Sequence, residues 1–496
     1  MLYTISKRFL LLSTVIAVSA CTQIQNNNIE QTSKTLEAPN ILFIYTDDQA
    51  PWAIGSSGNH QAITPNLDKL ASEGMSFPNA YTTTPVCSPS RAGLMTSQYG
   101  YELGIDDWIN TSGKSISRLE PELGLAPALE TWPEILQQAG YHTGLIGKWH
   151  LGELDKYHPT KQGYDEFVGF RSGGNSPINP KIEKDGVVTK RQGLTPDVLT
   201  HEAINFIQNN KDKKFALSVH FRAPHARWLP VAEEDQAPYL DMDMILPHPD
   251  YPNLDVTKTK RMMAEYLSSV RSVDRNVGNL LAELDKLSLS DNTLVVFTSD
   301  HGYNMGHNGI WHKGNGHWLL KNDTQATKNI PTNQRPNMYD NSIKVPSIVR
   351  WPSVIKANST NVSSMSNLDW FPTLVSLAKG KVNENTVVRG QDFTAALLDE
   401  NTVLSTDYYA AYSTLHQSIS AMRMYSDGKY KLIKDYKNRG RDEFYDLKRD
   451  PEERNNLIAT TKPELQQIIN AFDDMIFAKM IATNDPELEQ FFGDKK

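Results

Sequence analysis

Cysteine and net positive charge are both scarce in this sequence of 496 residues. It has two cysteines, Cys21 and Cys87, and its 58 acidic residues outnumber its 50 lysines and arginines, which gives a formal net charge of -8. Two cysteines cannot build a disulfide framework. An acidic chain also lacks the basic surface that binding to nucleic acid requires. Each cysteine therefore needs an explanation of its own, and no nucleic-acid partner is expected.

Long apolar runs are rare as well, and the N-terminal one is too short to span a bilayer. This run, Phe9–Val18, follows Lys7 and Arg8 in the pattern of a secretion signal. Its end, VSAC, resembles a bacterial lipobox with Cys21 as the lipidated residue. We expect residues 1–20 to be a lipoprotein-type signal peptide and residues 21–38 a flexible tether. The protein would then be exported and lipid-anchored in the bacterial outer membrane or periplasm, touching the membrane only through Cys21. Ordinary cleavage, with Cys21 as a bystander, is the alternative.

Short apolar runs alternate with segments of helical periodicity over most of the chain. The runs typical of buried strands are Asn40–Tyr45, Tyr141–Ile146, Lys214–Phe221, Thr293–Thr298 and Val345–Arg350. The helical segments are Thr64–Gly74, Leu129–Ala139, Pro196–Asn209, Asp255–Leu287 and Asp369–Ala378. This alternation predicts an α/β fold, in which a large, mostly parallel sheet is sandwiched by helices.

The pattern changes from about Tyr408, where short β-type runs are joined by turns. These runs are Tyr408–Tyr412, Ser420–Tyr425, Lys429–Lys434 and Glu443–Tyr445. They predict a small antiparallel sheet, which the helical segment Pro463–Lys479 would follow. We therefore expect a larger domain over residues 39–385 and a C-terminal α+β subdomain over residues 386–496.

Ionisable residues stand at the carboxyl ends of the predicted strands. Asp47 and Asp48 follow the first strand, and Asp300 and His301 follow the strand at Thr293–Thr298. Ligands of open α/β sheets bind at this edge. Adjacent carboxylates repel each other and lose hydration there, so a bound cation is the natural compensation.

Further ionisable residues follow the other strands, or lie between them. Lys148 and His150 end the second strand, His225 follows the third, and Lys313 lies in a loop rich in glycine, histidine and asparagine. That loop has no cysteine and few acids, so an oxyanion or sugar site is more natural there than a zinc site.

The segment Cys87-Ser88-Pro89-Ser90-Arg91 provides a candidate reactive centre. Pro89 suits the first turn of a helix, so Cys87 is expected at a helix N-terminus. Backbone N–H groups and the helix dipole favour an anion at such a position. Arg91 would add a fixed positive charge one turn further on.

Seven motifs in order resemble those of the type I sulfatase family, which lies within the alkaline-phosphatase-like superfamily. They are NILFIYTDDQ, CSPSR, GKWHLG, APH, TSDHG, WHK and FYDLKRDPEERNNL, and the resemblance covers Pro39 to Leu457. With these motifs and the export signal, the chain resembles exported Bacteroidota-type polysaccharide sulfatases. The resemblance implies that a maturation enzyme oxidises Cys87 to formylglycine. It also implies that Ca²⁺ is held by Asp47, Asp48, residue 87, Asp300 and His301.

The resemblance also implies the roles of the remaining residues. The modified residue 87 would attack the sulfur atom, while Arg91, Lys148 and Lys313 would stabilise charge on the sulfuryl oxygens. His225 would protonate the departing sugar oxygen, and His150 would act on the hydrated aldehyde to release sulfate. Two features depart from the family pattern: Thr96-Ser97-Gln98 replaces the usual continuation of the cysteine motif, and the loop Trp311–Asn337 is long.

Sulfate monoesters on carbohydrate are the predicted substrates. A marine algal polysaccharide such as ulvan or carrageenan is the first candidate, and glycosaminoglycan the second. Candidate sugar contacts are residues near the motifs, namely Asp106, Asp107, Arg222, Arg227, Trp228, His317 and Trp318. Two other functions stay open: a formylglycine-dependent phosphodiesterase or phosphonate hydrolase, and a non-catalytic glycan-binding lipoprotein.

Overall fold

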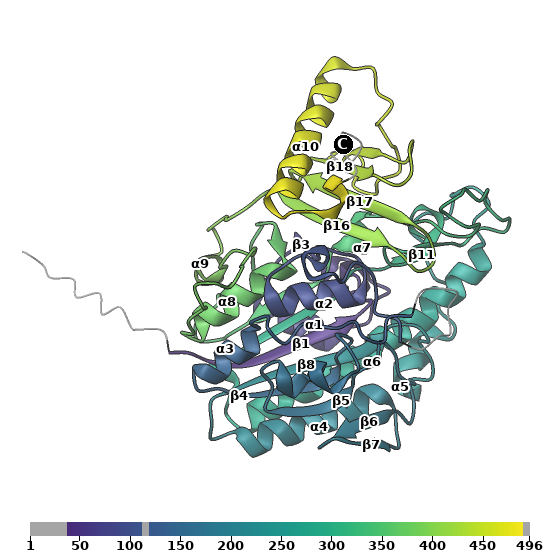
Figure 1. Ribbon diagram of the computed structural model, residues 1–496. Coiled ribbons are helices and arrows are strands. Elements are labelled where there is room, and N and C mark those ends of the chain that lie inside the picture. Colours follow the sequence, from purple (N-terminus) through teal and green to yellow (C-terminus); the bar gives the residue numbers. More distant parts are fainter. Residues whose placement is uncertain (1–36, 112–118, 490–496) are drawn as a thin grey trace, which may run out of the picture. The chain divides into compact units, whose positions relative to one another are not determined.

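The computed structural model describes residues 37–111 and 119–489, and the described residues from Ala38 onward belong to one compact unit (Figure 1). The expected signal peptide, the lipobox Cys21 and nearly all of the tether lie outside the described residues. Element labels follow Figure 1.

A ten-stranded sheet forms the centre of this unit, with strand order β14-β2-β13-β9-β1-β8-β4-β5-β6-β7. Its parallel core consists of β9 (Thr293–Ser299), β1 (Asn40–Asp47), β8 (Phe215–Pro224), β4 (His142–Lys148) and β5 (Glu166–Phe170). Its outer strands are β14 (Ser359–Thr360), β2 (Met75–Ser76), β13 (Ser347–Arg350), β6 (Lys181–Lys184) and β7 (Val187–Lys190). Because β13, β6 and β7 pair antiparallel with their neighbours, the sheet is mostly but not wholly parallel, which confirms the predicted fold class.

Alternate residues of β1 bury themselves in the two helical layers of this fold. Leu42 and Ile44 pack in the core cluster that includes side chains of α1 (Pro65–Ser72), α4 (Thr195–Asn210) and α6 (Val256–Lys286). Phe43 points to the opposite face, as expected for the period of two in a strand. There its ring lies 6.2 Å from that of Trp132 in α3 (Trp132–Gln138) and 5.6 Å from that of Trp370 in α8 (Trp370–Leu377). The strand is therefore buried on both faces, which explains its continuous apolar sequence.

A separate four-stranded antiparallel sheet lies in the C-terminal part of the chain, as predicted. It consists of β16 (Tyr408–Thr414), β17 (Ser420–Ser426), β18 (Tyr430–Asp435) and β19 (Glu443–Asp446), in that order. Helix α10 (Pro463–Ala482) packs against it through Phe472, Ile476 and Met480 (Figure 1). The proposed boundary between residues 385 and 386 stays a prediction.

Shorter elements complete the described chain. They are β3 (Ala80–Tyr81), α2 (Cys87–Thr96), α5 (Glu233–Gln236), β10 (Asn304–Met305), β11 (Ile310–His312), β12 (His317–Trp318), α7 (Asp340–Ile343), β15 (Met365–Ser366) and α9 (Thr394–Leu398). The sequence patterns did not predict β5, β6 and β7. Strand β7 is fully exposed, so it has no alternation of buried and solvent-facing residues from which a strand could be inferred.

Candidate active site

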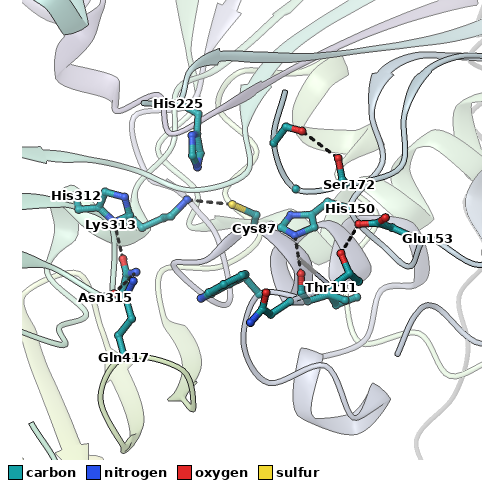
Figure 2. Close-up of a pocket in the computed structure, with 15 residues that line it drawn as sticks. Cys87, Thr111, His150, Glu153, Ser172, His225, His312, Lys313, Asn315 and Gln417 are labelled. Atoms are coloured by element: carbon teal, nitrogen blue, oxygen red, sulfur yellow. Dashed lines mark hydrogen bonds between the residues drawn. The ribbon is translucent and has the colours of Figure 1, made fainter. Parts of the chain in front are cut away.

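Cys87 is the first residue of helix α2 and is buried, with 2% of its surface exposed. Its thiol lies among charged groups from other elements. Lys313 Nζ donates a hydrogen bond to Cys87 Sγ at 3.0 Å (Figure 2). It also donates one to Asp48 Oδ1, at 2.7 Å. The thiol itself is 3.4 Å from Asp47 Oδ1 and 3.5 Å from His301 Nε2. The helix start therefore meets the carboxyl ends of β1 and β9.

Three buried carboxylates at this edge are matched by three buried cations. Lys148 Nζ donates to Asp47 Oδ2 at 2.6 Å, and Lys313 binds Asp48. Arg91 donates from Nε and Nη2 to Asp300 Oδ2, at 3.1 and 2.9 Å. A buried charge is tolerated only when it is paired and hydrogen-bonded, so the six groups form one electrostatic unit.

Four side chains of this unit and its surroundings could hold a metal ion. One ligand atom each from Asp47, Asp48, Cys87 and His301 lies within 4.8 Å of the others. Asp300 is close by, since its Oδ1 lies 3.3 Å from His301 Nε2. Among the described residues no hydrogen-bond partner was found for the buried atom Asp48 Oδ2. A divalent cation would satisfy this orphaned oxygen, and carboxylate oxygens are the ligands that hard cations prefer. The residues present therefore fit a divalent ion.

The environment sets the protonation of the central groups. Burial alone would raise the pKa of the Asp47 carboxyl, but Lys148 and the other cations offset it and hold that pKa well below its usual value. Burial and the nearby Asp47 carboxylate raise the pKa of the Cys87 thiol to about 12. An unmodified Cys87 would thus be a neutral thiol at physiological pH. Since the thiolate is the nucleophilic form of cysteine, the protein groups around residue 87 do not by themselves favour a reactive cysteine.

Two histidines flank Cys87 in the cavity (Figure 2). His150 has a left-handed backbone, with φ of 59°, and its Nε2 lies 3.3 Å from Ile109 O. Its Nδ1 is buried, and no partner for it was found among the described residues. A Cβ at Gly173 would lie 2.4 Å from the His150 ring, so glycine is required for the ring to sit there. Burial, followed by the charge of Lys148, lowers the pKa of His150 well below its usual value, so the ring is a neutral base.

His225 approaches from the end of β8. Its Nδ1 is 2.6 Å from Ala226 O, the geometry of a ring N–H that donates, and its Nε2 is 3.9 Å from Asp48 Oδ2. Burial lowers the pKa of His225 to about 4, although Asp48 and Asp47 partly offset this effect.

These groups open into a cavity of about 590 Å³. Its lining residues are Cys87, Trp108, Ile109, Asn110, Thr111, His150, Glu153, Ser172, Gly173, Gly174, His225, His312, Lys313, Asn315 and Gln417. A cavity of this volume is in the range that accommodates small ligands.

The structure brings the predicted site residues together, but it gives Arg91 a different environment from that of Lys313. Arg91 is 1% exposed, is bound to Asp300 and is not among the cavity-lining residues. Its predicted action on the sulfuryl group stays a prediction, and the contact seen here positions Asp300.

None of the seven candidate sugar contacts lines the cavity. Asp107 is typical: its carboxylate accepts hydrogen bonds from the backbone N–H groups of Trp108 and Leu415, at 2.9 and 2.8 Å. The neighbouring Trp108 lines the cavity instead. Sequence analysis missed Trp108, Glu153 and Gln417. Only Glu153 carried a usable signal, because it directly follows the GKWHLG motif.

Comparison with known proteins agrees with this architecture. A family model described as "Sulfatase" matches residues 39–381, and one described as "N-sulphoglucosamine sulphohydrolase, C-terminal" matches residues 333–480. The chain is 28% identical to an N-acetylglucosamine-6-O-sulfatase of Bacteroides thetaiotaomicron, over 92% of this chain and 90% of that protein. It is 30% identical to an N-acetylgalactosamine-6-sulfatase of Canis lupus familiaris, over 73% of this chain and 66% of that protein. It is 27% identical to an ulvan-active sulfatase of Formosa agariphila, over 90% of this chain and 82% of that protein.

Solved structures agree as well. A protein in complex with its substrate D-glucosamine-2-N,6-O-disulfate aligns with a TM-score of 0.76 and 25% identity, over 91% of this chain and 99% of that chain. The fold and the buried site thus define a hydrolase of the alkaline-phosphatase-like class. The chain belongs to the sulfatase family and is a sulfuric ester hydrolase.

Within the described residues, no helix is both long enough and apolar enough to cross a membrane.

Proposed function

We propose that this protein hydrolyses sulfate monoesters on a carbohydrate, and that its nucleophile is a formylglycine made from Cys87. The observation that carries this proposal is the placement of residue 87, which is buried at a helix N-terminus within reach of Lys313, Asp47 and His301. The raised pKa of its thiol argues against catalysis by cysteine itself. A hydrated formylglycine would supply a hydroxyl nucleophile at this position, and a second hydroxyl for the later release of sulfate.

A calcium ion held by Asp47, Asp48, Asp300, His301 and residue 87 would supply positive charge beside the sulfuryl oxygens. The charge balance supports this assignment. Three carboxylates and three cations leave the buried unit formally neutral. A divalent ion would make it positive, and the positive charge would attract an anionic sulfate ester.

Three basic side chains would bind the sulfate group or position the carboxylates. Lys313 reaches residue 87 and lies on the cavity wall, so it can bind a sulfuryl oxygen directly. Lys148 holds the Asp47 carboxylate in place and adds positive charge. We assign to Arg91 the same task at Asp300.

The two histidines take the proton-transfer roles. The Nδ1 of His150, for which the described part of the chain supplies no partner, can accept a proton from a hydroxyl on residue 87. His225 would give a proton to the departing sugar oxygen. A bound anion favours the protonated imidazole, so the substrate itself would raise the low pKa of His225.

A sulfated glycan is the proposed substrate class, because the similar proteins include sulfatases named for N-acetylglucosamine, N-acetylgalactosamine and ulvan. Glycosaminoglycan-type amino sugars come first in this proposal. Algal polysaccharides such as ulvan or carrageenan are the other candidates, and a panel of sulfated oligosaccharides would separate them.

We also propose that the protein is exported and lipid-anchored through Cys21, and that it has a catalytic domain over residues 39–385 and a smaller subdomain over residues 386–496. Labelling of the mature protein with a fatty acid, lost on Cys21→Ser, tests the anchor.

The test of the function itself is twofold. The mass of the Cys87 peptide, isolated after expression with a maturation enzyme, should be that of formylglycine. The same preparation should hydrolyse an aryl sulfate faster than an aryl phosphodiester. An unmodified cysteine in fully active protein would contradict the proposed nucleophile, and a faster diester reaction would favour a phosphodiesterase.

A further inference from the structure

Apart from its histidines, the described lining of the cavity has one basic and one acidic side chain. Lys313 is the basic side chain and Glu153 is the acidic one. Figure 2 shows the two charged residues on opposite sides of Cys87. The cavity is therefore electrostatically asymmetric.

Glu153 is held firmly in this wall. Its carboxylate accepts a hydrogen bond from Thr111 Oγ1, and its backbone oxygen accepts one from Arg171 Nη1 at 3.0 Å. Arg171 is itself fixed, since it binds both carboxylate oxygens of Glu183, at 2.9 and 2.6 Å, and Asp155 Oδ1 at 2.6 Å. A carboxylate supported in this way keeps a defined position when a ligand enters.

Lys313 offers little to a second anion. Its ammonium group is already bound to Asp48 and to residue 87, where the reacting sulfate would sit. The other polar side chains of the described lining, such as Asn315, Gln417 and Ser172, are neutral donors and acceptors suited to hydroxyl groups. Among the described lining residues, Lys313 is thus the one lysine or arginine, and the reacting sulfate uses it.

We propose that Glu153 is a specificity-determining residue that selects a sugar with a single anionic group. Its carboxylate accepts hydrogen bonds from hydroxyl groups of the sugar ring, and it disfavours a ring that carries a second sulfate or a carboxylate. Like charges brought together in a binding site suppress the wrong partner. This inference rests on the proposed function, because it assumes that a sulfated sugar fills the cavity.

The test is a binding measurement that does not depend on turnover. Full-length protein with Cys87→Ser, in calcium, is titrated calorimetrically with N-acetylglucosamine 6-O-sulfate and with glucosamine N,6-O-disulfate. We expect the monosulfate to bind at least about tenfold more tightly. Adding Glu153→Gln, which keeps the side-chain shape, should reduce this ratio to about threefold or less by improving binding of the disulfate.

Two matched variants control for indirect effects. Thr111→Val removes the hydrogen bond to Glu153 but keeps the charge, so the preference should persist. Glu122→Gln makes the same chemical change at a side chain that is 78% exposed and outside the cavity, and should alter nothing. An unchanged ratio in Glu153→Gln, equal binding of the two sugars by the parent chain, or no binding of either sugar would overturn the proposal. Aryl sulfate turnover by the matured, unsubstituted enzyme tests the proposed function separately.

Discussion

Two buried groups of paired acidic and basic side chains in this molecule can be compared. They differ in whether every charged side chain has all of its hydrogen-bond partners. In the active-site cluster, Asp47, Asp48 and Asp300 pair with Lys148, Lys313 and Arg91, and one carboxylate oxygen, Asp48 Oδ2, has no hydrogen-bond partner among the described residues. In the C-terminal sheet, Arg423 donates to both oxygens of Asp485, at 2.5 and 2.9 Å, and the pair is fully buried.

The difference indicates which cluster serves chemistry. A closed ion pair is satisfied internally, so removing one partner leaves the other charge buried and uncompensated. An open cluster beside a cavity has electrostatic capacity left for a metal ion and a substrate. Substitutions in the open cluster should therefore affect activity most, and those in the closed pair should affect stability most.

The largest expected effect is that of Cys87→Ser. A serine cannot provide the second hydroxyl group that the proposed mechanism needs to release sulfate. Multiple turnovers of an aryl sulfate should fall on the order of 10⁴-fold or more. The melting temperature should stay close to that of the parent chain, because the two side chains have nearly the same volume. A serine variant that retained full turnover would contradict the role of residue 87.

Removal of calcium should have the next largest effect on the open cluster. Dialysis of the matured enzyme against a chelator should reduce turnover by at least about 100-fold, because the proposed ion would stabilise charge at the sulfuryl oxygens. The melting temperature should also fall, since a ligand that binds only the folded state stabilises it. Calcium added back should restore both quantities, while magnesium serves as the control for a non-specific salt effect. Full activity in the chelator would refute the metal assignment.

Asp485→Asn should separate the two clusters by acting on stability alone. The buried Arg423 loses its counter-charge, so the free energy of unfolding should fall by about 3–5 kcal/mol. Denaturant unfolding measures this loss, and kcat/KM per folded molecule should stay unchanged. The double substitution Arg423→Met with Asp485→Leu removes both charges and should recover most of the stability. A large loss of kcat/KM in Asp485→Asn would show that the closed pair also serves the reaction.

The same contrast separates what could be predicted from the sequence from what could not. The open cluster was readable because each buried strand has a long apolar run, and a polar residue after such a run falls at one edge of the sheet. This rule alone predicts that Asp47, Asp300 and Lys148 lie at the same edge of the sheet. The cavity rim has no such rule, since it is built from loops and from Gln417 at the tip of the β16–β17 hairpin, distant in sequence from Cys87.

Asp107 shows the physical reason for the failure at the rim. In an irregular loop, the direction of each side chain depends on which backbone groups need a partner. Asp107 turns inward to accept hydrogen bonds from Trp108 and Leu415, so the loop is tied to the hairpin. Leu415 is distant from Asp107 in the sequence, so the residues around position 107 do not predict this orientation.

A third buried group gives the smallest expected effect, and it concerns pH. Lys431 Nζ lies 2.8 Å from Asp340 Oδ1 and 2.7 Å from Glu453 Oε1, and Lys344 Nζ lies 3.0 Å from Asp340 Oδ2. Asp340 thus has a second cation, while Glu453 shares Lys431 with it. Burial, only partly offset by Lys431, raises the pKa of Glu453 to about 7. Between its ordinary pKa and about 7, Glu453 is protonated in the folded chain and ionised in the unfolded chain. Folding then takes up a proton, so stability is highest at low pH and falls as pH rises through this window.

The expected slope for this group is about 1.4 kcal/mol per pH unit between roughly pH 5 and 7. Glu453→Gln has no titrating proton at this position, so its free energy of unfolding should lack that contribution. Urea unfolding of both proteins at several pH values measures the difference, with Asp485→Asn as a variant in which the slope should persist. Parallel pH curves for the parent chain and Glu453→Gln would show that Lys431 keeps both carboxylates ionised. The third group would then be fully charged and internally paired, like the Arg423–Asp485 pair.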